Sequence, residues 1–241
     1  MKMATSPHKN IEVRDRLIVA LDVPSADDAK DMVRNLGDSV TFYKIGLELF
    51  VAGNYIELTQ WLIEKDKKVF VDLKFFDVPQ TVNRAVVQLK KYGATFATVH
   101  GNDEILKAAV KDKNGCKILA VTVLTSLDKA DLADLGFQCD VEKLVLSRAR
   151  RALEIGCDGV ISSGLEAPAL RKENGDGFII VTPGIRPVDN KENDDQKRTV
   201  DVEEAFENGA DYIVVGRPIS AADDPVKAAD DIQRRIASYF S

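Results

Sequence analysis

Cysteine is scarce in this sequence, and long apolar runs are missing from it. The three cysteines, Cys116, Cys139 and Cys157, are an odd number, and no two of them have CxxC spacing. This usage is typical of reduced thiols and argues against a disulfide framework or a zinc site, so we expect a cytoplasmic location. Since no apolar run reaches the roughly 18 residues that a membrane span needs, we expect no membrane-spanning segment.

Several functional motifs are absent as well. No GxGxxG follows the first apolar run, no GxSxG occurs, and no set of His, Asp and Glu has metal-ligand spacing. These absences argue against a dinucleotide fold, a hydrolase nucleophile elbow and a metal centre. The formal net charge of −6 disfavours nucleic acid or an anionic membrane as the main partner, although a local basic pocket could still bind a small anion.

The chain is predicted to be one domain behind a short arm. Residues 1–14 are polar, lack the apolar stretch of a secretory signal and are predicted to form a flexible N-terminal arm. Residues 15–241 contain no low-complexity tract or internal linker and predict a single catalytic domain. The charged segment 187–198 is too short for a linker and is predicted to be a loop.

Short apolar runs alternate with longer amphipathic segments from residue 17 onward. Near-continuous apolar character is typical of strands buried on both faces of a parallel sheet. The amphipathic segments 25–36, 80–93 and 224–240 predict helices, two of them starting at the capping residues Ser25 and Asp224. The apolar runs are 17–23, 41–49, 68–75, 96–101, 117–124, 159–164, 178–185 and 212–219.

Eight such units in 241 residues predict a single (β/α)8 TIM barrel. The alternative is a doubly wound open sheet, against which the missing GxGxxG argues. A barrel places its chemistry at the C-terminal ends of its strands. Polar residues stand at or just after most of those ends, namely Asp22, Asp72, Lys74, His100, Thr125 and Arg186, and two more lie within runs, Lys44 in the second and Arg217 in the eighth. Any one of them could be a solvated loop residue, but a whole cluster at one pole predicts an active site.

The stretch VFVDLKFFDVPQ, residues 69–80, concentrates charge at the end of an apolar run. Side chains alternate faces along a strand, so Asp72 and Lys74 are both expected to point into the barrel mouth. Asp77 lies beyond the strand, in a loop before Pro79, which suits the first turn of the next helix. Negative neighbours favour the ammonium form of Lys74, which then suits a proton donor or electrostatic clamp better than a Schiff-base nucleophile. The alternative is a structural ion-pair network.

The last two strand ends predict a phosphate site. VVGRPI places Gly216 and Arg217 where barrels often bind phosphate through backbone N–H groups and a short helix. TPGIRP adds Gly184 and Arg186 from the preceding strand, and guanidinium groups match phosphate geometry. Segment 187–198 is long for such a connection and is predicted to be a lid over the ligand, the alternative being a disordered acidic loop.

These motifs together resemble the bacterial type of the orotidine 5′-monophosphate decarboxylase family. The matching stretches are LIVALD, YKIG, VDLKFFDVPQT, VTVLTS, TPGIR, DDQKR and VVGRPI, and the likeness covers about residues 15 to 238. Related phosphate-binding barrels share the Asp-x-Lys-x-x-Asp pattern but not the Arg186 motif followed by DDQKR. The resemblance implies conversion of orotidine monophosphate to UMP and CO2 in de novo pyrimidine synthesis, with no cofactor or metal.

The resemblance also implies residue roles and a homodimer with active sites at its interface. Lys74 would protonate C6 of the pyrimidine, and Asp72 would lie beside the substrate carboxylate. Asp77 and Thr81 would reach into the neighbouring subunit's site and contact ribose. The remaining implied contacts are Asp22 and Lys44 with the ribose hydroxyls and the charged network, Thr125 with the pyrimidine, and Gln196, Gly216 and Arg217 with phosphate, supported by Arg186.

Small departures and two other functions remain. Gln80 stands where the family more often has Asn, and Phe76 occupies a variable position. Roles for His100 and Ser126 stay open. The alternatives are a magnesium-dependent sugar-phosphate decarboxylase or aldolase of the same barrel group, and a non-catalytic phosphosugar-binding barrel.

Overall fold

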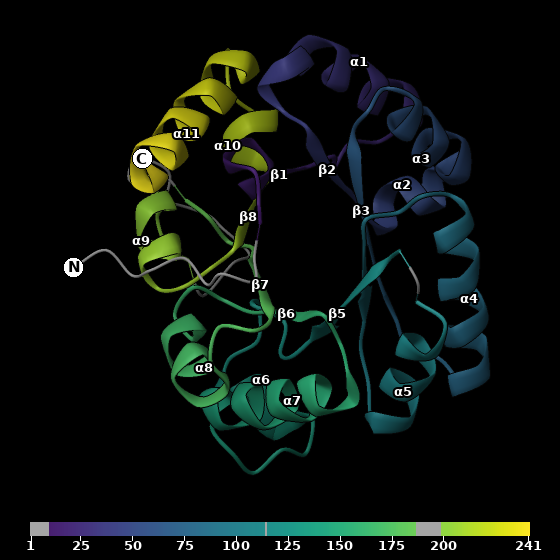
Figure 1. The fold of residues 1–241 in the computed structure, drawn as a ribbon, viewed down its shortest axis with the longest axis vertical. Coiled ribbons are helices and arrows are strands. Elements are labelled where there is room, and N and C mark those ends of the chain that lie inside the picture. Colours follow the sequence, from purple (N-terminus) through teal and green to yellow (C-terminus); the bar gives the residue numbers. More distant parts are fainter. Residues whose placement is uncertain (1–9, 114, 187–198) are drawn as a thin grey trace.

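A computed structural model describes residues 10–113, 115–186 and 199–241 as a closed barrel of parallel strands ringed by helices (Figure 1). Each strand pairs with the next in sequence order, and β1 closes the barrel by pairing with β8. The predicted TIM barrel is confirmed, and the open-sheet alternative is wrong. The strands are β1 Leu17–Ala20, β2 Phe42–Ile45, β3 Lys68–Phe75, β4 Phe96–Val99, β5 Lys117–Val121, β6 Gly159–Ile161, β7 Ile179–Thr182 and β8 Tyr212–Val215.

The helices follow the amphipathic segments. Ser25 and Asp224 cap their helices as predicted, because their side chains accept the N–H groups of Asp28 and Lys227. Pro79 occupies the first turn of its helix. The helices are α1 Ala26–Leu36, α2 Leu47–Ala52, α3 Tyr55–Glu64, α4 Pro79–Lys91, α5 Asp103–Lys111, α6 Lys129–Asp134, α7 Val141–Ile155, α8 Ala167–Asn174, α9 Val202–Glu207, α10 Arg217–Ser220 and α11 Pro225–Phe240.

Two apolar layers hold the barrel together. An outer layer lies between the strands and the helices, and a smaller one fills the barrel interior. In the interior, the Phe96 ring packs 5.1 Å from the centroids of both Phe42 and Tyr212. Since Phe42, Phe96 and Tyr212 each open their strands, these rings fill the N-terminal half of the barrel. Polar side chains are thereby left to the C-terminal half.

The predicted arm boundary at residue 14 falls inside a short 3-10 helix, Val13–Arg16. Arg16 is buried and donates a hydrogen bond of 3.0 Å to the carbonyl of Asp211. In the described end of the arm, Arg14 donates a hydrogen bond of 3.1 Å to the carbonyl of Asp38 and accepts one of 2.9 Å from Gln233 at its own carbonyl. Residues 1–9 lie outside the described residues.

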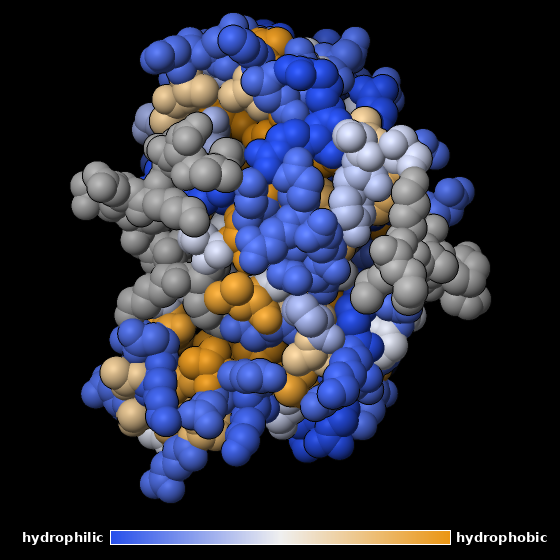
Figure 2. Space-filling view, turned by 90° about the vertical axis from the view of Figure 1, so that its left-hand side faces the viewer, coloured by the Kyte–Doolittle hydropathy of each residue, from blue (hydrophilic) through white to orange (hydrophobic). Residues whose placement is uncertain are grey.

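The outer surface on the side of α8, α9 and α11 is largely hydrophilic, with smaller apolar areas between the charged side chains (Figure 2). All three cysteines are unpaired. Among the helices of the described ranges, none is long and apolar enough to cross a membrane. The cytoplasmic location stays a prediction.

Candidate active site

A cavity of about 520 Å³ opens at the C-terminal ends of the barrel strands. Its walls come from residues at or after strands on every side of the barrel except β4. Most of the residues predicted from the sequence lie together there, namely Asp22, Lys44, Asp72, Lys74, Thr125, Arg186, Gly216 and Arg217; Ser126, for which no role was predicted, lines the cavity as well. The predicted convergence at the C-terminal pole is confirmed for these positions.

Four charged side chains form a row of alternating sign across the cavity. The Nζ atom of Lys44 lies 3.0 Å from Asp22 Oδ1 and 3.7 Å from Asp72 Oδ2. The Nζ atom of Lys74 lies 3.0 Å from Asp72 Oδ1. Lys44 and Asp72 are nearly buried, with 12% and 14% of their side chains exposed, whereas Lys74 is 34% exposed at the end of the row. Lys74 is thus the more exposed of the two ammonium groups in the row.

Burial alone would raise the pKa of Asp72, but its neighbours reverse that effect. The two ammonium groups and hydrogen bonds from Lys74 and Thr98 hold the pKa of this carboxyl below its usual value. Asp72 is therefore ionised at neutral pH. A buried carboxylate kept ionised in this way is a fixed negative charge at the wall of the cavity.

The strand that carries Asp72 and Lys74 is irregular where they lie. Along β3 and β4, Val71 pairs with Ala97 and Phe75 with Val99, so the register shifts between these two pairs. Lys74 has a φ of 48°, in the left-handed region that few non-glycine residues adopt. Irregular strands of this kind occur next to active sites, where they re-aim side chains.

Thr98 is a residue of this site that the sequence analysis missed. It lies fully buried on β4, and its hydroxyl donates to Asp72 Oδ1 and accepts the N–H of Lys74, each at 2.9 Å. The signal in the sequence is weak, because Thr98 is a single polar residue within the apolar run FATV. Its strand position alone places it on the same face as Phe96, which points into the barrel.

The segment after β7 forms another side of the cavity. Gly184 has a φ of 77°, which a glycine adopts without strain, and the chain turns there toward Arg186. The backbone N–H of Arg186 donates to the carbonyl of Val200, and that of Val200 donates to the carbonyl of Gly184. The two described ends that flank segment 187–198 are therefore held side by side. The predicted lid and Gln196 lie outside the described residues.

The end of β8 leads directly into a short helix. Gly216 precedes α10, and Arg217 is the first residue of that helix. Both line the cavity, two strands around the barrel ring from β2, which carries Lys44, and three strands from β3, which carries Lys74. The short helix expected from the phosphate-site pattern is present at this position.

Asp77 and Thr81 do not line this cavity. Both are exposed, and the Asp77 carboxylate accepts the N–H of Val78 at 2.6 Å. Their apolar neighbours Phe76 and Val78 are 68% and 64% exposed. The third charge of the Asp-x-Lys-x-x-Asp pattern thus lies outside the cavity that holds the other two within one chain.

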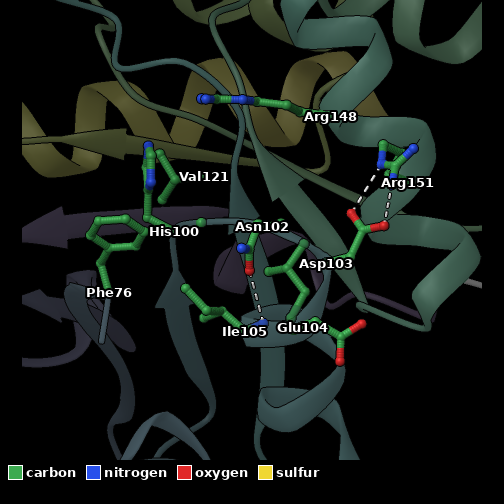
Figure 3. A pocket seen from close by; sticks show the side chains of 12 residues that line it. Phe76, His100, Asn102, Asp103, Glu104, Ile105, Val121, Arg148 and Arg151 are labelled. Atoms are coloured by element: carbon green, nitrogen blue, oxygen red, sulfur yellow. Dashed lines mark hydrogen bonds and ion pairs between the residues drawn. The ribbon is translucent and has the colours of Figure 1, made fainter. Parts of the chain in front are cut away.

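A second cavity, of about 620 Å³, lies beside the first and shares Val121 with it. In Figure 3, the rings of Phe76 and His100 lie together on one side, and Arg151 is paired with Asp103 on the other. Burial, Arg148 and Lys74 lower the pKa of His100, so its ring is neutral at physiological pH. The described residues that line this cavity form no row of alternating charges like that of the first.

Within the described ranges, no three His, Cys, Asp or Glu side chains are grouped closely enough to hold a metal ion. The residues that line the first cavity pair carboxylates with ammonium groups instead.

Comparison with known proteins gives a consistent result. The profile of the "Orotidine 5′-phosphate decarboxylase / HUMPS family" matches residues 15–232. An orotidine 5′-phosphate decarboxylase of Methylococcus capsulatus is 62% identical over 234 residues, which is 97% of each chain. One from Nitrobacter winogradskyi is 50% identical and also covers 97% of each chain. The crystal structure of the Lactobacillus acidophilus enzyme superposes with a TM-score of 0.82 at 36% identity, over 92% of this chain and 99% of the other.

Proposed function

Since the chain belongs to the orotidine 5′-phosphate decarboxylase / HUMPS family, we propose that it converts orotidine 5′-monophosphate (OMP) to UMP and CO2 with Lys74 as the proton donor. Its relatives, which match over 97% of each chain, identify its enzyme class as orotidine-5′-phosphate decarboxylase, a carboxy-lyase of pyrimidine biosynthesis. The observation that carries the residue-level proposal is the row of alternating charges that ends at Lys74.

Lys74 supplies a fixed positive charge and a proton at C6, which this decarboxylation lacks in water. Loss of CO2 leaves an electron pair on C6 of the pyrimidine, where the ring delocalises it poorly. An ammonium group held beside C6 stabilises that charge and then donates its proton to the carbon. Because Asp72 already fixes the Lys74 ammonium at 3.0 Å, little reorganisation is needed when the charge develops.

Asp72 contributes by its charge. Placed beside the substrate carboxylate, it repels the ground state, and this repulsion is relieved as CO2 departs. Lys44 neutralises the other oxygen of Asp72 and, with Asp22, binds the ribose hydroxyls. The substrate carboxylate thus enters a site in which every neighbouring charge is already fixed.

The proposed phosphate site is at the ends of β7 and β8 in the same cavity. Gly216 offers backbone and Arg217 a guanidinium group, with Arg186 supporting them from the segment after β7. The family resemblance adds the side-chain amide of Gln196, which lies outside the described residues. Thr125 contacts the pyrimidine. Binding energy from the phosphate holds the base against Lys74, although the phosphate is remote from the bond that breaks.

Arg217→Ala is expected to raise KM for OMP by roughly 10- to 100-fold, the effect of losing a charge-assisted hydrogen bond to phosphate. Turnover of orotidine, which lacks the phosphate, should be the same in both proteins. Steady-state kinetics with the two substrates measure this. Arg234→Ala is the matched control, because Arg234 is an exposed arginine on α11 paired with Asp231. An unchanged KM for OMP would remove Arg217 from the phosphate site.

We further infer that the active unit is a homodimer in which Asp77 and Thr81 serve the neighbouring site. Within one chain both are exposed and outside the cavity. The exposed Phe76 and Val78 flank Asp77 and offer apolar area for a second copy to cover. The second cavity adjoins this segment and offers space for side chains of that copy.

Two other functions make different predictions. A magnesium-dependent sugar-phosphate decarboxylase or aldolase of this barrel group would lose its activity in EDTA. A non-catalytic phosphosugar-binding barrel would bind OMP without consuming it. The test is to follow OMP by its ultraviolet absorbance in EDTA and, separately, a keto-hexulose phosphate with Mg²⁺. We expect consumption of OMP in EDTA and none of the sugar phosphate; the reverse pattern would replace the proposed function with the first alternative.

A further inference from the structure

Thr98 forms hydrogen bonds with both Asp72 and Lys74, the ion pair at the centre of the proposed mechanism. Its hydroxyl hydrogen goes to Asp72 Oδ1, and its oxygen accepts the backbone N–H of Lys74. The side chain is completely buried and does not line the reaction cavity. Thr98 therefore contacts the two charged residues from behind, without reaching the space that a substrate would fill.

The irregular pairing of β3 with β4 explains why a side chain is needed here. Between the pairs Val71–Ala97 and Phe75–Val99, β3 contains Asp72, Leu73 and Lys74, whereas β4 contains Thr98 alone. The N–H of Lys74 is donated to the Thr98 side chain instead of a carbonyl of β4. The ladder resumes immediately afterwards, because His100 donates its N–H to the carbonyl of Phe75.

The same bond holds a backbone conformation that would otherwise be unfavourable. Lys74 has a φ of 48°, and non-glycine residues stay in this region only when their surroundings fix them there. That φ sets the direction in which the Lys74 side chain leaves the strand. The contacts of Asp72 are divided as well: Oδ1 accepts from Lys74 and Thr98, and Oδ2 faces Lys44.

We propose that Thr98 is a positioning residue for the decarboxylation, whose hydroxyl fixes the Lys74 backbone and the Asp72 carboxylate so that the ammonium group stays aimed at C6. This inference rests on the proposed function of the same site. A small error in the placement of a catalytic group costs much of its rate contribution, even when binding is unaffected. Thr98 should therefore control kcat far more than the affinity for ligands.

The test compares variants with and without the hydroxyl. Thr98→Val keeps the shape and removes the hydrogen bonds, and is expected to lower kcat for OMP by roughly 10- to 100-fold. KM for OMP and the dissociation constant of UMP should change by less than about threefold. Thr98→Ser keeps the hydroxyl and should retain kcat within about threefold of the wild type. Thr98→Ala is a second hydroxyl-free variant, and its kcat should fall as in Thr98→Val. It takes the place of Thr98→Val in the test if the valine protein fails to fold.

Thr122 gives a matched control on the next strand end. It is also a buried threonine, and its hydroxyl donates to the carbonyl of Ile161 at 2.9 Å. Thr122→Val removes one buried hydrogen bond without changing the contacts of Asp72 and Lys74. The thermal stability of this variant should therefore fall, while its kcat is retained. The specific prediction is a loss of kcat in Thr98→Val that Thr122→Val does not share.

Two results would overturn the inference. One is a kcat of Thr98→Val or Thr98→Ala within about threefold of the wild type, and the other is an equal loss in Thr98→Ser and the hydroxyl-free variants. Failure of the proposed function would look different, because the wild-type protein in the same assay would then not consume OMP at all.

Discussion

Lys74→Ala is expected to lower kcat for OMP decarboxylation by at least roughly 10⁴-fold, since one group supplies both the charge stabilisation and the proton. Binding of UMP should be partly retained, because the proposed phosphate site is at the end of β8, three strands around the barrel from Lys74 on β3. Absorbance kinetics with OMP and calorimetry with UMP measure the two effects separately. A large loss of kcat with measurable UMP binding is the result that assigns chemistry to Lys74.

Lys68 provides the control for this variant. It lies at the other end of the same strand β3 and is paired with the buried carboxylate of Asp15. Lys68→Ala breaks a lysine–carboxylate pair too, but at the N-terminal base of the barrel. We expect it to lower stability and leave kcat unchanged. Near-normal turnover in Lys74→Ala would instead show that the row of charges is a structural ion-pair network without a catalytic role.

The second large effect is rescue of activity by mixing two inactive proteins. Lys74→Ala and Asp77→Ala homodimers should each be nearly inactive. In a heterodimer, one site combines the intact Lys74 of one subunit with the intact Asp77 of the other. After random reassortment of subunits, roughly a quarter of all sites should be complete, so activity should rise to about that share of the wild type.

A second mixture controls for this result. Asp72 and Lys74 lie in the same cavity of one chain, so every heterodimer of Asp72→Asn and Lys74→Ala has a lesion in each site. That mixture should stay inactive. Absence of rescue in the first mixture, once exchange of subunits has been verified by mass spectrometry, would show that Asp77 does not act across an interface.

The fold and half of the site follow from simple sequence patterns. Apolar runs that alternate with amphipathic segments predicted the strands, and polar residues at or near the ends of those runs predicted the cavity. Alternation also placed Asp72 and Lys74 together, although the strand is irregular between them. The prediction from alternation was correct because Phe75 is four residues after Val71 on β3, whereas their partners on β4, Ala97 and Val99, are two residues apart. An excess of two residues keeps Val71 and Phe75, on either side of the irregularity, on the same outer face of the barrel.

Other features depend on pairing between strands and leave little trace in the sequence. Nothing local marks Thr98 as the partner of Lys74, since the two are 24 positions apart and meet only through the register of β3 and β4. The left-handed conformation of Lys74 cannot be predicted from the sequence either, because lysine is not a residue that such positions favour. The exposure of Asp77 depends on how the chain leaves β3 before α4 begins.

The most direct measurement uses OMP labelled with carbon-13 at its carboxylate, incubated with the wild-type protein in EDTA. We predict labelled CO2 and UMP in equal amounts, and neither product from Lys74→Ala at comparable times. Unchanged OMP with the wild type, products that disappear in EDTA, or equal product formation by Lys74→Ala would contradict a metal-independent decarboxylation that depends on Lys74.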